Sequence, residues 1–128
     1  MKLLIDTNAF IWASKEPELL STQARRLLED AYSDRFVSVA SIWEMQIKHA
    51  RGKLPLGGNV DQVVVEWIRP LIAQFLPIEV RHLGKLYGLP DIHRDPFDRI
   101  LVAQALSENM VVISSDPVLR SYGITVVW

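Results

Sequence analysis

The sequence contains no cysteine. This absence excludes disulfide bonds, thiolate catalysis and cysteine-ligated zinc, and it fits a protein that works in a reducing compartment. Long hydrophobic runs are missing too, since no stretch approaches the roughly 20 apolar residues that cross a bilayer. Only three apolar residues separate Lys2 from Asp6, too few for the core of a signal peptide. We therefore expect a soluble, cytoplasmic protein with no membrane association.

The length and composition predict one domain that covers residues 1–128. A chain of 128 residues, 49% of them hydrophobic, can bury a core without disulfides or a structural metal. The same hydrophobic content argues against disorder. We find no internal repeat, low-complexity tract or linker.

Apolar runs of strand length alternate with helical patterns along the chain. Strands are predicted at residues 2–5, 36–39, 75–76, 110–113 and 124–127, and helices at 7–13, 22–32, 42–50, 60–74, 79–87 and 97–108. This alternation requires crossover connections, which produce a parallel sheet with helices on both faces. We predict a three-layer α/β/α sandwich around a central parallel sheet of four to five short strands.

Two aspartates come just after predicted strands. Asp6 ends the apolar run at residues 3–5, and Asp116 follows the run at residues 111–115 in the same way. A carboxylate beside a buried apolar run is costly unless something pairs with its charge. Ligands of parallel sheets bind outside the carboxyl ends of the strands, so we expect both acids at that edge.

Two further acids lie at predicted helix starts. Ser41 is expected to cap a helix in which Glu44 occupies the third position, as in a capping box. Asp98 lies in the first turn of a later helix, just after Asp95. Because these helices also begin at the carboxyl edge, the acids can converge in one cleft. The simplest shared partner for several partly buried carboxylates is a hard divalent cation, whose chemistry is usually on phosphate.

The net charge of −1 at pH 7 hides an uneven distribution. Five acids belong to the predicted cleft and its margin: Asp6, Glu44, Asp95, Asp98 and Asp116. Without these five, ten of the 15 acids remain against 14 lysines and arginines, which leaves a charge of +4 on the rest of the protein. A mildly basic surface around an acidic, metal-neutralised pocket permits a polyanionic substrate.

Four segments, in this order, resemble the PIN domain, and most closely the VapC-type toxins of bacterial toxin–antitoxin pairs. These segments are Leu3-Leu4-Ile5-Asp6-Thr7-Asn8, Ser41-Ile42-Trp43-Glu44, His93-Arg94-Asp95-Pro96-Phe97-Asp98-Arg99 and Ser114-Ser115-Asp116. The resemblance covers the chain from residue 2 to its end. Its most specific part is the stretch at residues 95–99, followed by Leu101-Val102-Ala103-Gln104-Ala105.

The resemblance implies an endoribonuclease that depends on Mg²⁺ or Mn²⁺. The acidic set of the family falls on Asp6, Glu44, Asp98 and Asp116, with Asp95 as an additional acid close by. Asn8 and Ser114 match polar positions that brace the acids by hydrogen bonding in the family. One departure is Ser114, where a threonine is common; serine keeps the hydroxyl.

Mg²⁺ prefers one or two carboxylates together with waters and substrate phosphate. We expect Asp6 and Asp98 to be the principal direct ligands, with Glu44 and Asp116 binding directly or through water. Such an ion would lower the pKa of a water and stabilise charge on the phosphodiester. The family resemblance also implies an RNA substrate, a homodimer and a cognate VapB-like antitoxin that blocks the acidic cleft.

Each acid also has a purely structural interpretation. Asp6 can cap the helix that follows it, and Asp116 can open a turn before Pro117. Asp95 precedes Pro96, and we favour the cap for it. Arg94 and Arg99 either steer phosphate or pair with the carboxylates, whereas Lys48 and Arg51 are either solvated side chains or RNA-backbone contacts. His93 is either a base or phosphate contact or a surface histidine, and we favour the surface histidine.

Three classes of function remain open from the sequence. The first is the metal-dependent ribonuclease, for which the intact acidic set is the evidence. The second is a catalytically silent module of the same fold that binds RNA or protein. The third is a phosphatase with an aspartyl-phosphate intermediate; against it, Asp6-Thr7-Asn8 lacks the second aspartate that haloacid-dehalogenase phosphatases place two residues after their nucleophile.

Overall fold

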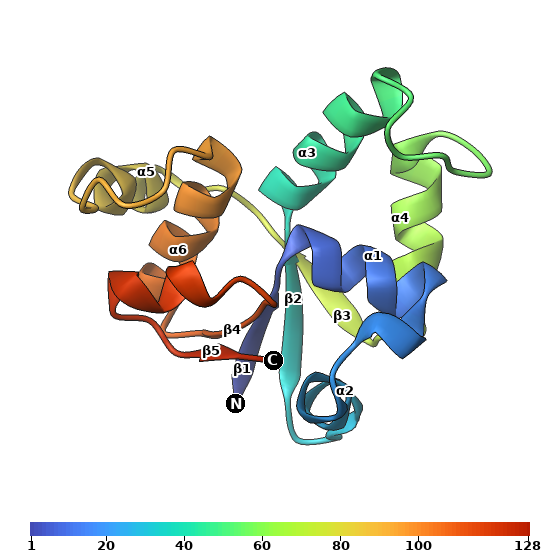
Figure 1. The fold of residues 1–128 in the computed structure, drawn as a ribbon, viewed down its shortest axis with the longest axis horizontal. Helices are drawn as coiled ribbons and strands as arrows, with labels where there is room; N and C mark the ends of the chain where they lie inside the picture. The colour runs from blue at the N-terminus through green and yellow to red at the C-terminus, as the bar shows by residue number, and fades with distance from the viewer.

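Five parallel strands form the centre of the protein in a computed structural model that describes residues 1–128 (Figure 1). The strands are β1 (Lys2–Ile5), β2 (Asp34–Ser38), β3 (Ala73–Leu76), β4 (Val111–Ile113) and β5 (Val126–Val127). Their order in the sheet is β3-β2-β1-β4-β5, and every pairing is parallel. The predicted parallel sheet is confirmed, and β1 lies at its centre.

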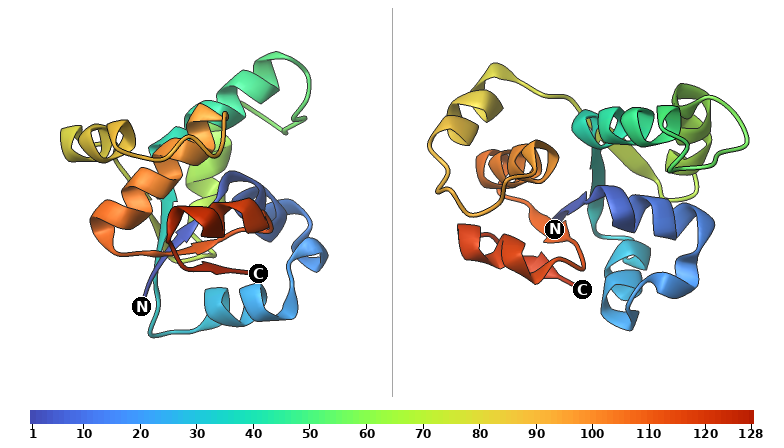
Figure 2. Two further views of the ribbon diagram at one scale, coloured as in Figure 1. Left: turned by 60° about the vertical axis from the view of Figure 1, so that its left-hand side comes forward. Right: turned by 45° about the horizontal axis from the view of Figure 1, so that its top comes forward.

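Helices cover both faces of this sheet, as predicted (Figures 1 and 2). They are α1 (Thr7–Lys15), α2 (Thr22–Glu29), α3 (Val39–Ala50), α4 (Val60–Ile68), α5 (Val80–Tyr87) and α6 (Pro96–Glu108), with 3₁₀ turns η1 (Pro17–Leu19) and η2 (Pro117–Tyr122). None of these helices is long and apolar enough to span a membrane.

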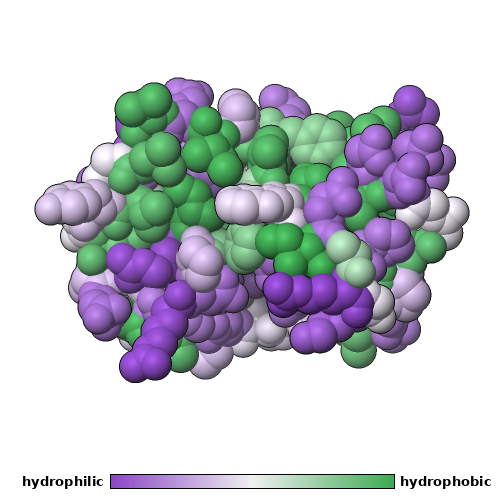
Figure 3. All heavy atoms as spheres, turned by 90° about the horizontal axis from the view of Figure 1, so that it is seen from above, coloured by the Kyte–Doolittle hydropathy of each residue, from purple (hydrophilic) through white to green (hydrophobic).

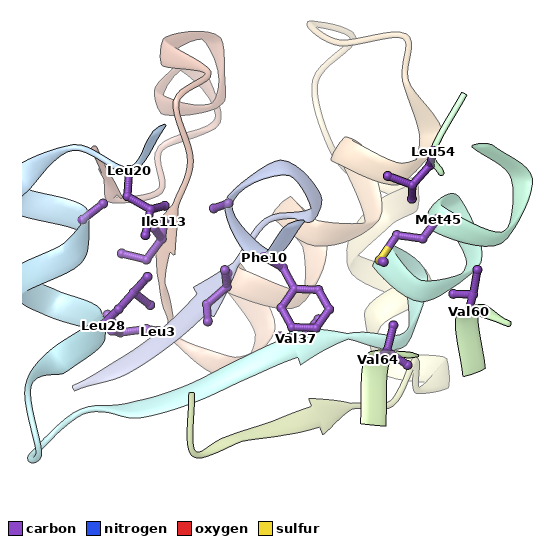
Figure 4. Close-up of a cluster of buried hydrophobic side chains, with 13 residues drawn as sticks. Leu3, Phe10, Leu20, Leu28, Val37, Met45, Leu54, Val60, Val64 and Ile113 are labelled. Carbon is purple, nitrogen blue, oxygen red and sulfur yellow. The ribbon is translucent and has the colours of Figure 1, made fainter. Parts of the chain in front are cut away.

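The alternation of side chains along β1 divides the core between the two faces. Leu3 and Ile5 pack into a cluster with residues of α1, α2, α3 and α4, where Phe10 is fully buried (Figure 4). Leu4 points to the other face and packs with residues of α6 and η2. β1 is buried on both sides, as expected for a central strand of a parallel sheet.

The predicted helix at residues 60–74 is too long, because α4 ends at Ile68. Pro70 follows two residues later, and a proline has no backbone N–H with which to continue the helical hydrogen bonds. Ile72 then adopts a left-handed conformation with a φ of 50°, and β3 begins directly after it. The helix at 22–32 also ends early, at Glu29.

The prediction of a capping box between Ser41 and Glu44 is wrong. α3 begins at Val39, and its N-cap is Ser38, whose hydroxyl accepts a hydrogen bond from the backbone N–H of Ala40 at 3.0 Å. Strand β2 therefore leads straight into the helix. Glu44 becomes the sixth residue of α3, so it lies about one turn further along the helix than the sequence suggested.

Candidate metal centre

The carboxyl ends of the neighbouring strands β1 and β4 carry the first two acids of the site. Asp6 follows β1 directly, and its backbone N–H donates to the carbonyl of Ile113, the last residue of β4, at 3.1 Å. Asp116 lies three residues beyond Ile113. The expected placement of both acids at one sheet edge is confirmed, because parallel neighbours end together.

Asp6 combines a structural role with an unusual charge environment. One carboxylate oxygen accepts a hydrogen bond from the N–H of Ala9 at 2.8 Å and caps α1. The residue is only 9% exposed. Burial raises the pKa of Asp6 to about 6, reinforced by the charges of Glu44 and Asp116 and opposed by hydrogen bonds from Ser114 and Ala9. Its negative charge is therefore poorly compensated within the protein.

Asp98 shows the same behaviour in the first turn of α6. Burial is again the main cause that raises its pKa to about 6, followed by the charge of Asp95, and Glu44 and Asp6 add to it. Asp95 itself is the N-cap of α6, accepting from the N–H of Phe97 at 2.9 Å. The favoured interpretation of Asp95 as a helix cap is thus confirmed.

His93 is partly exposed, with 24% of its side chain accessible, but it contacts the acidic group rather than solvent alone. Its Nε2 is 2.8 Å from Oδ2 of Asp116 and 3.6 Å from Oδ2 of Asp98. The hydrogen bond with Asp116 raises the pKa of His93 above its usual value and lowers the pKa of Asp116. His93 is held by its backbone N–H, which donates to the hydroxyl of Tyr122 at 2.6 Å.

His93, Asp98 and Asp116 form the one group of three side chains whose potential ligand atoms all lie within 4.8 Å of one another. Asp6 does not belong to this group in the structure, although its charge acts on Asp98. The only hint of His93 in the sequence is its position two residues before Asp95.

Glu44 is oriented by a residue that the sequence did not single out. Thr7 Oγ1 lies 2.6 Å from Oε1 of Glu44 and 2.9 Å from the hydroxyl of Ser41. A hydroxyl carries one proton, so donation to Glu44 leaves Thr7 to accept from Ser41. The other Glu44 oxygen pairs with Lys48 Nζ at 2.9 Å. The place of Thr7 between Asp6 and Asn8 was a signal that could have identified it.

The two polar residues expected to brace the acids behave differently. Ser114 is 1% exposed, hydrogen-bonds to Asp6, and accepts from the backbone N–H of Asp116 at 3.1 Å. Asn8 is exposed on the first turn of α1 and makes no hydrogen bond to any acid. The support expected from Asn8 comes instead from Thr7.

A groove runs beside the acids between α3 and α6. It has a volume of about 270 Å³, and its lining includes Glu44, Lys48, Arg51, Asp95 and Phe97. β1 and β2 run toward the top of Figure 1, and the view down onto that side shows hydrophilic and hydrophobic side chains mixed along it (Figure 3). The groove therefore offers both positive charge and an aromatic ring next to the acids.

The two arginines that flank Asp98 are not equivalent. Arg99 donates to the carbonyl of Pro90 at 2.8 Å, so its guanidinium is used within the fold. Arg94 is exposed and has no hydrogen bond or ion pair with another residue. Of the two, Arg94 is the one whose charge is free to meet a ligand.

The donor set of this site fits a divalent cation. Carboxylate oxygens are hard ligands suited to Mg²⁺ and Mn²⁺. The raised pKa values of Asp6 and Asp98 reflect first their burial and then the charges of neighbouring acids, so the ionised form of each is poorly stabilised within the protein. A bound cation supplies the missing positive charge and favours the ionised form of both groups.

The sequence matches the model of the PIN domain family over residues 3–124. The fold is similar to that of a chain in the VapBC2 complex from Rickettsia felis bound to a promoter DNA fragment, with a TM-score of 0.69, 10% identity, and coverage of 99% of this chain and 98% of the other. It is also similar to VapBC-1 from nontypeable Haemophilus influenzae, with a TM-score of 0.66, 18% identity, and coverage of 99% and 97%. FitAcB from Neisseria gonorrhoeae gives a TM-score of 0.60, 20% identity, and coverage of 97% and 95%. No curated protein sequence matches significantly.

Proposed function

The chain belongs to the PIN domain family, and we propose that it is a divalent-metal-dependent endoribonuclease that acts as the toxin of a toxin–antitoxin pair. The observation that carries this proposal is the convergence of Asp6, Glu44, Asp98 and Asp116, from four separate segments, at one edge of the sheet. Burial raises the pKa of both Asp6 and Asp98 to about 6, and the charges of neighbouring acids, Glu44 among them, add to the shift of each. Several acids placed close together do not stabilise the fold, so their convergence is best explained by a bound ligand.

We assign Asp6 and Asp98 as principal ligands of Mg²⁺ or Mn²⁺, with Glu44 and Asp116 binding directly or through water. When bound, such an ion supplies a more acidic water and positive charge beside the phosphodiester in the transition state. The residues of the chain orient this set. Thr7 fixes Glu44, and Ser114 holds the carboxylate of Asp6 and the backbone of Asp116.

RNA binding is assigned to the groove next to the acids. Lys48 and Arg51 line this groove on α3, and the exposed Arg94 precedes α6 on its other side. Their positive charges would contact the phosphate backbone, and Phe97 offers a ring to a base. These positive side chains would hold the RNA backbone, while one phosphodiester lies beside the acidic residues.

The partner proposed for this chain is a VapB-like antitoxin. The similar structures are described as complexes, VapBC from two organisms and FitAcB from a third. We propose that the present chain is likewise a single PIN domain in the cytoplasm that forms homodimers and is inhibited by an antitoxin covering the acidic cleft.

Cleavage of a structured RNA pool tests the proposal. Purified wild-type protein would be incubated with the RNA in the presence of Mg²⁺ or Mn²⁺, and in parallel with EDTA. The variants Asp6→Asn and Asp98→Asn would be tested with the same metal ions. Asp61→Asn is the matched control, because Asp61 is exposed on α4 and outside the acidic group. We expect cutting by wild type and control alone. Equal cutting by all variants would mean that the acids do not catalyse it, and a protein that neither cuts RNA nor binds a divalent metal would instead be a silent RNA- or protein-binding module.

A further inference from the structure

We propose that His93 is a metal ligand in this centre, and that its imidazole, together with Asp98 and Asp116, makes the site prefer Mn²⁺ over Mg²⁺. The inference rests on the proposed function, because it concerns the same metal site. It goes beyond the acidic set by adding a nitrogen donor and by assigning a metal preference.

The distances within the group suit coordination of one ion. Two ligand atoms at right angles around an octahedral ion, each with a bond of about 2.1 Å, lie about 3.0 Å apart. His93 Nε2 is 2.8 Å from Oδ2 of Asp116 and 3.6 Å from Oδ2 of Asp98, values on either side of that spacing. The potential ligand atoms of all three side chains lie within 4.8 Å of one another, so side-chain adjustment without backbone movement would bring them around one ion.

Hydrogen bonds to η2 place the imidazole of His93 next to Asp116. The N–H of His93 donates to the hydroxyl of Tyr122, which is 7% exposed and ends the 3₁₀ turn η2. Asp116 begins the same turn and uses its Oδ1 to accept from the N–H of Val118 at 3.0 Å. Its Oδ2 is left to face His93. One short element thus positions both the nitrogen and the oxygen donor.

The group is open enough for an ion and a substrate to reach it. The side chains of His93, Asp98 and Asp116 are 24%, 28% and 35% exposed. A histidine needed only for packing would be expected deeper, as His82 is, with no exposed side-chain surface. His93 instead lies at the entrance of the acidic cleft.

A nitrogen donor changes the preference among metals. Mg²⁺ is bound by oxygen ligands and waters, so an imidazole contributes little to its affinity. First-row transition ions accept imidazole readily, and among them Mn²⁺ also suits carboxylates. A site with one imidazole and two or more carboxylates therefore favours Mn²⁺.

The direct test is pulsed electron paramagnetic resonance of Mn²⁺ bound to the full chain, because a coordinated imidazole modulates the spin echo through its ¹⁴N nucleus. Wild type would be compared with His93→Gln, which keeps a polar side chain of similar length. His49→Gln is the matched control, since His49 Nδ1 hydrogen-bonds to the carbonyl of Leu54, away from the acids. Circular dichroism would confirm that the variants are folded.

We expect a ¹⁴N signal in wild type and in His49→Gln and its loss in His93→Gln. Calorimetric titration should show that His93→Gln weakens Mn²⁺ binding by roughly tenfold or more and changes Mg²⁺ binding by less than about threefold.

Two results would overturn the inference in distinguishable ways. Mn²⁺ that binds without a ¹⁴N signal, or with a signal that survives in His93→Gln, leaves an oxygen-only metal site and refutes the role of His93 alone. Protein that binds neither ion refutes the metal site itself, and with it the proposed function.

Discussion

Thr7 and Glu44 are 37 positions apart in the sequence, and a hydrogen bond of 2.6 Å joins the hydroxyl of Thr7 to Oε1 of Glu44. Thr7 is 5% exposed at the start of α1, and Glu44 lies in the second turn of α3. The contact ties these two helices together beside Asp6. Together with the ion pair to Lys48, it fixes the direction of the Glu44 carboxylate.

Replacing Thr7 by valine is expected to impair both stability and activity. The change keeps the shape of the side chain but leaves Ser41 and Glu44 without a buried partner, which should lower the free energy of unfolding by about 1–3 kcal/mol. RNA cleavage should fall as well, because Glu44 loses its orientation. Urea denaturation and a cleavage assay measure the two effects. Thr22→Val, at an exposed position of α2, should change neither; equal stability of both variants would contradict the expectation.

The metal-free protein should become less stable as the pH rises from about 4 to about 6. The pKa of Asp6 is 3.8 as a free group and about 6 in the fold, so the folded state binds the proton more tightly in this window. The contribution of Asp6 to stability therefore falls with rising pH and levels off above about 6. Asp98, whose pKa is raised to a similar value, acts in the same direction.

Asp6→Asn isolates this effect, because asparagine retains the cap of α1 and carries no charge. In EDTA at pH 8, its free energy of unfolding should exceed that of wild type by on the order of 2 kcal/mol. At pH 4 the two proteins should be equal within error, as Asp6 is then largely protonated. Denaturant titrations at both pH values measure the difference, and an advantage of the same size at both would refute the charge explanation.

Lys48→Met should weaken RNA binding, because the variant loses a positive charge beside the acids. Lys48 pairs with Glu44 at 2.9 Å and lines the groove beside the acids. The loss of one phosphate contact should reduce the slope of log affinity against log salt by about 1. Lys85→Met on α5, outside this groove, is the control. Fluorescence anisotropy in EDTA measures binding without cleavage; identical slopes for the two variants would remove Lys48 from the interface.

Arg35→Met tests a structural feature far from the acids. Arg35 is 8% exposed, and its guanidinium donates to the carbonyls of Leu28, Asp30 and Ser33 at the end of α2. Its removal takes one donor from each of these carbonyls, of which Asp30 keeps the N–H of Ser33, and should cost about 2–4 kcal/mol of stability. Arg26→Met, exposed on α2, should cost less than about 0.5 kcal/mol. Thermal unfolding compares them, and comparable melting temperatures would show that water replaces the guanidinium.

The sequence predicted the features that depend on local pattern. An acid directly after an apolar run indicated where β1 ended and where Asp6 would lie. The pairing of Asp95 with Pro96 indicated the start of α6 in the same way. Both signals depend on only a few consecutive residues, and the predictions made from them agree with the structure.

The features that the sequence did not predict depend on contacts between distant segments. Ser38 and Ser41 are both suitable caps, and the pairing of β2 with its neighbouring strands extends the strand to Ser38, where α3 begins. His93 reaches Asp116 across 23 positions, through a loop whose conformation depends on Tyr122. No short sequence pattern predicts a contact between residues so far apart.

Asp6, Asp95 and Asp116 each commit one carboxylate oxygen to a backbone N–H at the start of the following helix or turn. Asparagine can make the same hydrogen bond, and the codons of aspartate and asparagine differ by a single base. One point mutation can therefore silence the chemistry and leave the folded surface intact. Under the proposed function, such changes at Asp6 or Asp116 give a chain that still folds but no longer cleaves RNA.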